Sequence, residues 1–170
     1  MSNITSQISN IKLRKLEPTD VVFLYQWEND ASAWADGANH NPLSQQDLRD
    51  YIASTTGDIY RDGQLRLIIE DGGLTMGCID LFDLDIRNRR AALGMYIAPE
   101  YRGKGVGKEA LRQLESYAFG HLNLRVLYAI ISTNNTACTA LYRNAGYIPS
   151  SPLSNWTLEG DAILWLKSQI

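Results

Sequence analysis

A glycine-rich, basic loop that joins an apolar run to a helical pattern is the feature that most constrains the fold of this chain. Residues 91–110 read AALGMYIAPEYRGKGVGKEA, with the loop at residues 102–108. The apolar run predicts a strand over residues 91–98, and the pattern after the loop predicts a helix over residues 106–122. A strand that enters a helix through bare backbone presents several N–H groups to one anion. The sequence therefore predicts a site for a phosphate-bearing ligand at this loop.

The remaining hydrophobic patterns predict a mixed α/β sandwich with helices on both faces of the sheet. Further strands are expected at residues 11–15, 64–70, 74–86, 124–131, 147–150 and 161–167, and further helices at residues 18–29, from residue 44 and at residues 134–145. The unbroken apolar run at residues 124–131 is typical of a strand buried on both faces. The helix after the glycine loop is expected to bury one stripe, formed by Ala110, Leu111, Leu114, Tyr117 and Ala118.

Length and composition indicate one domain spanning residues 1–170. No apolar run approaches ~18 residues and the first residues lack the apolar centre of a secretory signal, so we expect neither a membrane span nor export. The two cysteines, Cys78 and Cys138, have no metal-type spacing, so a metal is not expected and a reduced, cytoplasmic setting fits. Residues 1–86 hold six Lys/Arg against fourteen Asp/Glu, whereas residues 87–170 hold ten against five. If the acidic half and the basic half of the chain line one cleft, that cleft suits one cationic partner and one anionic partner.

Three phosphate-binding patterns compete for the loop. The P-loop pattern fails because its lysine is followed by Glu109 rather than by Ser or Thr. A dinucleotide-binding pattern matches residues 105–110 but lacks the acid, about twenty residues further on, that binds the ribose. The pattern that remains is Arg102-x-x-Gly105-x-Gly107. A glycine-rich helix entry that merely turns the chain is the alternative without a ligand.

The remaining pattern resembles the R/Q-x-x-G-x-G/A loop that binds the coenzyme A pyrophosphate in the GNAT superfamily of N-acetyltransferases. Residues 135–147 are similar to a second family pattern, N-x-x-[AS]-x-x-L-Y-x-x-x-G-[FY], and follow a predicted strand. The similarity spans residues 64–147, and residues 77–111 look most like the spermidine/spermine-type and ribosomal-protein-acetylating branches. The resemblance implies a mostly antiparallel mixed sheet with one splayed parallel strand pair and acetyl-coenzyme A as co-substrate. It also implies that the pyrophosphate is bound by Arg102, Gly103, Lys104, Gly105, Val106, Gly107 and Lys108.

The resemblance further implies that the pantetheine arm of the cofactor lies between the two parallel strands. Backbone groups of Met95, Tyr96 and Ile97 would bond the arm as they would an added strand, and Asn135 would bond it from the other side. Asn135 also fits the N-cap position of its helix, and the two roles are compatible.

Tyr142 is the catalytic candidate that the resemblance implies, because the matching tyrosine of the family protonates the departing coenzyme A thiolate. A phenol with an ordinary pKa of about 10 is a suitable donor to a thiolate of slightly lower basicity. The alternative is that Tyr142 is a helix-face aromatic side chain that only packs on the sheet.

The resemblance leaves the general base unassigned. Many relatives carry Glu at the start of the fourth strand, where this chain has Ala92. Asp80 and Asp83 occupy third-strand positions where polyamine-acetylating relatives carry acids, so both are catalytic candidates. Strand alternation places them on opposite faces unless a bulge intervenes, and each equally fits a solvated strand edge. A base that acts through water, or an amine that arrives partly neutral, is the alternative.

The sequence thus predicts an acetyl-coenzyme A-dependent N-acetyltransferase in which a primary amine attacks the thioester directly in a ternary complex. The acidic first half favours a cationic acceptor, such as a polyamine, an aminoglycoside or a protein N-terminus. Acceptor contacts are expected in residues 28–60 and in the third strand, with Trp34, Asp36, His40 and Asn41 as candidates. Their alternative role is loop packing.

The alternative function is a non-catalytic acyl-coenzyme A-binding sensor or docking module, which the missing Glu at Ala92 suggests. Nucleic-acid binding through the basic run at residues 87–90 is disfavoured by the net charge of −3 and by the lack of aromatic residues there. No membrane partner is expected, and a homodimer is compatible with the family resemblance.

Overall fold

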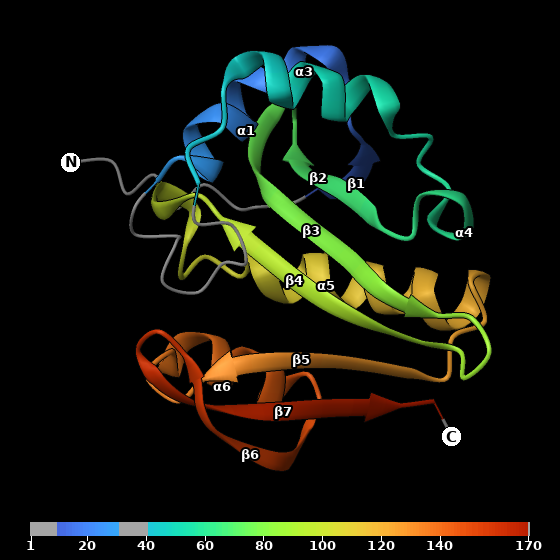
Figure 1. Cartoon of the computed structure of the whole chain (residues 1–170), viewed down its shortest axis with the longest axis vertical. Coiled ribbons are helices and arrows are strands. Elements are labelled where there is room, and N and C mark those ends of the chain that lie inside the picture. The colour runs from blue at the N-terminus through green and yellow to red at the C-terminus, as the bar shows by residue number, and fades with distance from the viewer. Residues whose placement is uncertain (1–9, 31–40, 170) are drawn as a thin grey trace.

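One mixed sheet organises the fold. The structure, a computed structural model, describes residues 10–30 and 41–169. Within them a seven-stranded sheet has the order β1-β2-β3-β4-β5-β7-β6 (Figure 1). Its strands are β1 (Ile11–Lys15), β2 (Leu65–Asp71), β3 (Leu74–Asp85), β4 (Arg90–Ile97), β5 (Val126–Ser132), β6 (Ile148–Thr157) and β7 (Gly160–Ser168). Every neighbouring pair is antiparallel except β4 and β5. The predicted mostly antiparallel mixed sheet is confirmed.

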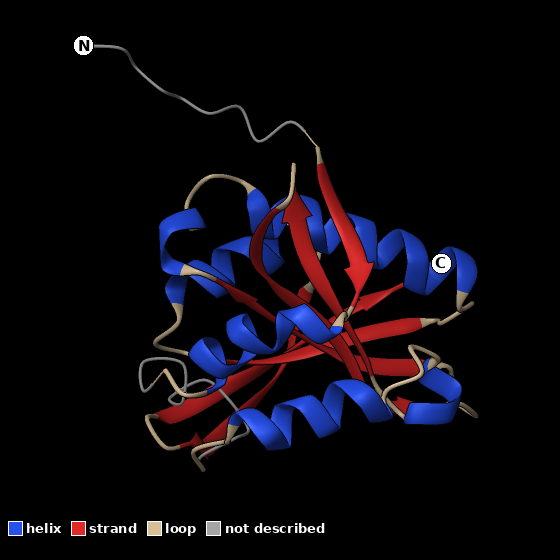
Figure 2. Ribbon diagram, turned by 90° about the horizontal axis from the view of Figure 1, so that it is seen from above, coloured by secondary structure: helices blue, strands red, loops and turns tan. Residues whose placement is uncertain are grey.

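Helices cover both faces of the sheet, as predicted (Figure 2). α1 (Val21–Glu28) and α3 (Gln45–Ser54) pack on one face, and α5 (Val106–Ser116) and α6 (Thr136–Asn144) pack on the other. The shorter elements are α4 (Ile59–Asp62), the 3-10 turns Pro18–Asp20 and Pro99–Tyr101, and the π-helical turn Tyr117–His121 that extends α5. Among the described residues, no helix is both long and apolar enough to cross a membrane.

Local sequence signals set the helix ends. The Ser44 hydroxyl accepts a hydrogen bond from the Asp47 N–H at 3.0 Å, and the Asp47 carboxylate accepts one from the Ser44 N–H at 2.8 Å, which closes the predicted cap of α3. The side-chain oxygen of Asn135 accepts from the Cys138 N–H at 3.0 Å and begins α6. Gly146 follows this helix with a left-handed φ of 90°. Both predicted caps and the predicted glycine terminus are confirmed.

β4 and β5 are parallel but separate after a short ladder. The ladder consists of three residue pairs, Arg90↔Val126, Ala91↔Leu127 and Ala92↔Tyr128. Beyond them the strands diverge (Figure 1), and β5 pairs with β7 along its whole length. Among the described strands, β4 from Leu93 to Ile97 pairs with β3 only. The predicted splayed parallel pair is confirmed.

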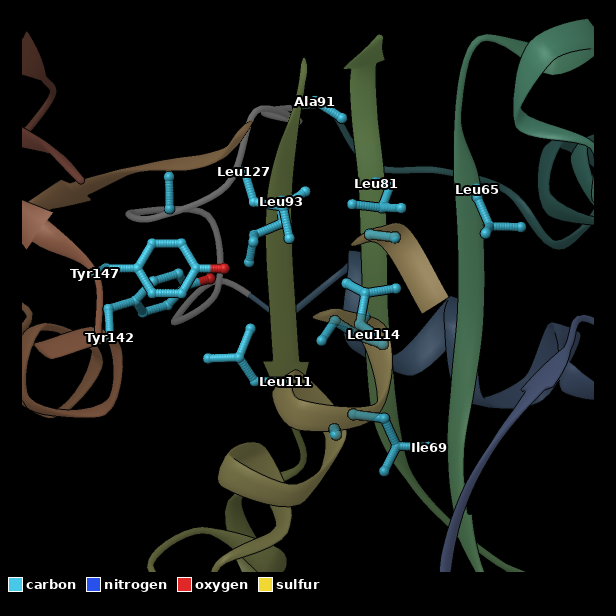
Figure 3. Close-up of a cluster of buried hydrophobic side chains, with 14 of the residues drawn as sticks. Leu65, Ile69, Leu81, Ala91, Leu93, Leu111, Leu114, Leu127, Tyr142 and Tyr147 are labelled. Atoms are coloured by element: carbon cyan, nitrogen blue, oxygen red, sulfur yellow. The ribbon is translucent and has the colours of Figure 1, made fainter. Parts of the chain in front are cut away.

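Two hydrophobic clusters hold the helices to the two faces. The larger lies under α5 and α6 and includes Leu65, Ile69, Leu81, Leu93, Leu111, Leu114, Leu127, Tyr142 and Tyr147 (Figure 3). The smaller lies under α1 and α3 and consists of Leu24, Trp27, Leu48, Ile52, Ile68 and Cys78. Alternate residues of β2 and β3 therefore serve different clusters, which fixes the register because a one-residue slip would exchange them.

Two burial predictions are wrong. Ile130, in the middle of β5, is 41% exposed, because α1 and α3 lie over the other edge of the sheet and leave this face of β5 open (Figure 1). Tyr117, expected in the buried stripe of α5, is 36% exposed. It begins the π-helical turn, whose wider spacing rotates side chains away from the regular helical stripe.

Asp20 is a carboxylate that the fold buries, with 1% of its surface exposed. It accepts hydrogen bonds from Arg14 Nη1 at 2.8 Å and Nη2 at 2.9 Å, and from the Glu17 N–H at 2.8 Å. A buried charge requires such a paired and hydrogen-bonded partner. The pair fastens the turn before α1 to β1.

Candidate active site

The glycine loop passes from β4 into α5 through left-handed backbone. Gly103 has a φ of 71° and Gly105 a φ of 85°, a region that side chains rarely adopt. Gly105 is the N-cap of α5, and this helix has no side-chain cap. Its first N–H groups therefore lack a side-chain acceptor and carry the positive end of the helix dipole. This geometry suits an anion.

The basic side chains of the loop have different positions. Arg102 Nε donates to the Ile97 carbonyl at 2.8 Å, and the guanidinium lies 5.7 Å from the centroid of the Tyr96 ring. Lys104 and Lys108 are exposed. Arg102 thus holds the loop against the end of β4, whereas Lys104 Nζ lies 5.9 Å from the centroid of the Tyr101 ring.

Val106 and Gly107 fasten the start of α5 to the core. Val106 is 1% exposed. A Cβ atom at Gly107 would lie 3.3 Å from Met95 Sδ and 3.4 Å from Leu141 Cδ2. Gly107 therefore allows α5 to approach β4 and α6 closely, which is a packing role and differs from the left-handed role of Gly105.

The backbone of β4 faces two neighbours in alternation. The Ala98 N–H donates to the Met76 carbonyl of β3 at 2.9 Å, and in an antiparallel ladder every second residue bonds in this way. Tyr96 therefore turns its N–H and C=O toward β3. Met95 and Ile97 turn theirs toward the side where β5 has diverged. Of the three predicted pantetheine contacts, Met95 and Ile97 are the two whose backbone groups face this gap.

Tyr142 lies on α6 in the larger cluster, together with Leu93 of β4 and Leu127 of β5 (Figure 3). Its side chain is 2% exposed, and its ring lies 4.9 Å from that of Tyr147 in an edge-to-face contact. Burial raises the pKa of Tyr142 well above its ordinary value, so the hydroxyl keeps its proton at neutral pH. The packing role is therefore observed. A protonated phenol beside the gap is also what an acid for a thiolate leaving group requires.

An ion pair that sequence reasoning missed lies next to Tyr147. Lys167 Nζ donates to Glu115 Oε2 at 2.6 Å and to the Ala145 carbonyl at 2.7 Å. Among the described residues, Glu115 Oε1 and the Tyr147 hydroxyl are buried without a hydrogen-bond partner. Lys167 ties the end of α6, just after Tyr142, to α5. The sequence signal is a lysine in the otherwise apolar pattern of β7.

Asp80 lies in an ion-pair cluster on the sheet face that α1 and α3 cover. Its two carboxylate oxygens accept from Arg66 Nε at 2.9 Å and Nη2 at 2.8 Å. Arg66 Nη1 also donates to Glu28 at 2.6 Å. Because both oxygens of Asp80 are engaged by the guanidinium, the geometry opposes its predicted role as the base.

Asp83 lies in a β-bulge, where the register between β3 and β4 shifts between Phe82 and Asp85. Its φ is 49°, so the bulge that would exempt it from strand alternation is present. The Tyr128 hydroxyl of β5 donates a hydrogen bond to the Asp83 carboxylate. Burial and this hydrogen bond raise the pKa of Tyr128 to about 12. Tyr128 was not predicted from the sequence. The signal that could have pointed to it is a residue with a hydroxyl group in an otherwise apolar predicted strand.

A surface pocket of about 380 Å³ opens beside the end of β4. Its lining residues include the aromatic Phe23, Trp27 and Tyr96 and the acidic Asp30 and Glu100. The Trp27 and Tyr96 ring centroids are 5.4 Å apart. Aromatic faces and carboxylates both attract cations, so this pocket suits an ammonium group.

Of the four acceptor candidates named from the sequence, Asn41 alone lies among the described residues. Asn41 is exposed and does not belong to the described wall of the pocket. Trp34, Asp36 and His40 lie outside the described residues. Asp30 lies in the predicted acceptor region 28–60, whereas Glu100 was not predicted because its convergence with Asp30 depends on β4 and α1 meeting in space.

Comparison with known proteins gives the family. The sequence profile described as the acetyltransferase (GNAT) domain matches residues 10–148. A spermidine N(1)-acetyltransferase of Escherichia coli strain K12 is 30% identical over 141 residues, which cover 81% of this chain and 73% of that protein. A putative ribosomal N-acetyltransferase of Bacillus subtilis is 32% identical over 145 residues, which cover 82% and 78%. The crystal structure of a spermidine N-acetyltransferase from Vibrio cholerae in complex with CoA and spermine has a TM-score of 0.85 at 23% identity and covers 95% of this chain and 96% of that one.

The splayed sheet, the glycine loop and these matches define the class of the protein, which is an acetyltransferase. The chain belongs to the GNAT acetyltransferase family. Acetyl-coenzyme A as co-substrate fits this family and agrees with the prediction from the glycine loop.

Proposed function

We propose that this acetyltransferase transfers the acetyl group of acetyl-coenzyme A to a primary amine of a small cationic acceptor, by direct attack in a ternary complex. The observation that carries the proposal is the separation of β4 from β5 just before an uncapped glycine loop. The separation exposes strand backbone to a partner, and the loop offers N–H groups at the end of that strand. An extended donor with a diphosphate group fits both features.

The pyrophosphate binds at residues 102–108 in this proposal. The first N–H groups of α5 contact the phosphate oxygens, and the helix end contributes roughly 0.3–1 kcal/mol for each interacting charge. Lys104 and Lys108 add mobile positive charge. Arg102, whose Nε is hydrogen-bonded to β4, contributes through its remaining guanidinium N–H groups.

The pantetheine arm lies along β4 in this proposal. Met95 and Ile97 bond it through the backbone groups that face the gap, as in strand addition. Asn135 contributes from the opposite side of the gap at the start of α6, in addition to its role as a helix cap.

The acetyl transfer proceeds by attack of the amine nitrogen on the thioester carbonyl carbon. Backbone N–H groups of β4 that face the gap polarise the carbonyl oxygen. As the C–S bond breaks, the Tyr142 hydroxyl, which is protonated at neutral pH, gives its proton to the thiolate. General acid assistance of this kind accelerates a reaction by roughly 10²–10⁴.

The acceptor we favour is a polyamine. The pocket that holds Asp30 and Glu100 combines negative charge with aromatic rings, which suits an alkylammonium chain. The E. coli relative is named for spermidine acetylation. The B. subtilis relative is named as a putative ribosomal acetyltransferase, so a protein N-terminus is the competing acceptor.

A coenzyme A thiol-release assay against a panel of spermidine, spermine, aminoglycosides and peptides tests the proposal. We expect release with a polyamine, and a fall in kcat of about 10-fold or more in Tyr142→Phe. The matched control is Tyr117→Phe, which removes a hydroxyl from a partly exposed ring and should retain activity. Wild-type turnover in folded Tyr142→Phe would contradict the role of this residue as the acid.

The second candidate is an acyl-coenzyme A-binding module without catalysis, which the methyl side chain at Ala92 favours. It requires that acetyl-coenzyme A raises the melting temperature and that no amine of the panel releases thiol. Turnover with any amine rejects it.

A further inference from the structure

A polar pair lies on the sheet where β4 and β5 separate. The last paired residues of these strands are Ala92 and Tyr128, and Phe82 of β3 lies opposite Ala92 on the other side. Tyr128 reaches over Ala92 and donates its hydroxyl hydrogen bond to Asp83, the residue after Phe82. The methyl group of Ala92 leaves room for this crossing.

This pair lies on the face opposite Tyr142. Leu93 and Leu127, the neighbours of Ala92 and Tyr128 along their strands, belong to the same cluster as Tyr142. Because side chains alternate along a strand, Ala92 and Tyr128 point to the other face. Among the described helices, none covers β5 on that face, so an acceptor can approach there (Figure 1).

The backbone of Asp83 is left-handed, although nothing in the local sequence requires this conformation. Its left-handed φ of 49° is more common for Asp than for most residues but is favoured by Gly. Leu81 belongs to the larger cluster, so regular strand alternation would turn Asp83, two residues later, toward the face that carries Tyr142. The bulge instead brings the exposed carboxylate of Asp83 to Tyr128. Strained residues of this kind concentrate at functional sites because the surrounding structure must enforce them.

Two further charged groups face the pair. Arg90 of β4 and Asp85 of β3 form an ion pair at 3.1 Å, and both act electrostatically on the Tyr128 hydroxyl. Because they neutralise each other, the Asp83 carboxylate keeps a net negative charge at the point where the gap begins. A cationic amine is attracted to this point.

We propose that Asp83 is the catalytic carboxylate that binds the acceptor ammonium and takes its proton, and that Tyr128 is the positioning residue that holds Asp83. This inference rests on the proposed function. The ammonium gives one proton to Asp83, and the neutral nitrogen attacks the thioester carbon. As the C–S bond breaks, the nitrogen gives its second proton to water and the thiolate takes a proton from Tyr142. Asp83 and Tyr142 then exchange protons with water, so the products are the amide, the coenzyme A thiol and one released proton.

The first test compares Asp83→Asn with Asp50→Asn in the thiol-release assay, with the best amine of the panel. Asn tolerates left-handed backbone, so Asp83→Asn is expected to fold. We expect its kcat/KM to fall about 100-fold or more, while the rise in melting temperature with coenzyme A stays as in the wild type. Asp50→Asn removes the same charge from an exposed position of α3, where the carboxylate accepts a hydrogen bond from Gln46, and should retain near wild-type turnover. Asp83→Gly, which suits the φ of 49°, should lose the same activity while melting no lower than Asp83→Asn.

The second test is the pH dependence of kcat/KM. A carboxylate base gives an acidic limb, since protonation below its titration range stops the reaction. Asp83→Asn should abolish this limb. Tyr128→Phe should keep the limb and lower kcat more than it changes KM, because Asp83 loses the hydrogen-bond donor that positions it. A wild-type limb and wild-type kcat/KM in Asp83→Asn would overturn this inference alone. An absence of thiol release by the wild-type protein with every amine would instead overturn the proposed function.

Discussion

Replacement of Gly105 by Ala isolates the cost of left-handed backbone at the start of α5. Gly105 has a φ of 85°, and a Cβ atom there would meet nothing within 4 Å. The change is therefore free of steric clash, and its cost is the left-handed conformation, about 1–2 kcal/mol. Alanine also restricts the unfolded chain, which offsets roughly 0.4–1 kcal/mol of that cost. The net loss of unfolding free energy is about 1 kcal/mol.

Gly107→Ala is the matched variant in the same loop. Here a Cβ would lie 3.3 Å from Met95 Sδ and 3.4 Å from Leu141 Cδ2, and Gly107 lies in the first turn of α5. Alanine gains up to about 1 kcal/mol in helix propensity. The tight contacts oppose this gain, but both atoms are ends of flexible side chains that can shift. The two effects are of similar size, so the net change is close to zero.

Thermal unfolding without ligand measures both variants. A loss of 1 kcal/mol lowers the melting temperature of a domain of this size by about 2–4 °C, so we expect Gly105→Ala to melt at least about 2 °C below Gly107→Ala. Gly105→Asn should lie between the wild type and Gly105→Ala, because Asn tolerates left-handed backbone. If Gly107→Ala were the less stable variant, steric contact rather than backbone conformation would control this loop, and the reasoning would be refuted.

Two further predictions concern charge and thiol burial. Arg14→Met leaves the buried Asp20 carboxylate without its ion-pair partner, so the free energy of unfolding should fall by about 3 kcal/mol. Arg112→Met breaks an exposed pair and should leave the denaturation midpoint unchanged, and equal effects of the two variants would contradict the argument. Burial raises the pKa of Cys78 to about 12, so a thiol reagent at pH 8 should label the native protein once, at the half-buried Cys138. Labelling of two thiols per native chain, or retained labelling in Cys138→Ser, would show that Cys78 is accessible.

The parts of the site that depend on neighbouring residues were predictable from the sequence. The left-handed glycines, the uncapped entry into α5 and the Asn135 cap all follow from the properties of a few consecutive residues. The splayed strands were predictable only through resemblance to a family, because no local pattern says where a parallel ladder ends. The burial of β5 was mispredicted because an apolar run does not reveal which face a helix covers, as Ile130 demonstrates.

The partners of the charged side chains were not predictable, because each is chosen by tertiary packing. Asp80 and Asp83 are three residues apart and look alike in the sequence. Arg66, from the neighbouring strand, engages Asp80, whereas a bulge turns Asp83 to Tyr128, two strands away. Strand alternation assigns the two carboxylates to the correct faces of the sheet only where the strand is regular, and the bulge interrupts that regularity. The bulge therefore decides which of the two carboxylates lies beside Tyr128.

The gap between β4 and β5 offers a place where the two oppositely charged substrates of the proposed reaction can meet. The strands β1 to β3, with α1 and α3, come from the acidic residues 1–86, whereas the glycine loop, α5 and α6 come from the basic remainder. The proposed acid, Tyr142, and the proposed base, Asp83, lie on opposite faces of one sheet. A continuous ladder would separate them by a layer of paired backbone. Because the ladder ends at Ala92, an anionic donor bound on the side of α5 and a cationic acceptor arriving over the open face can reach the same point from two directions.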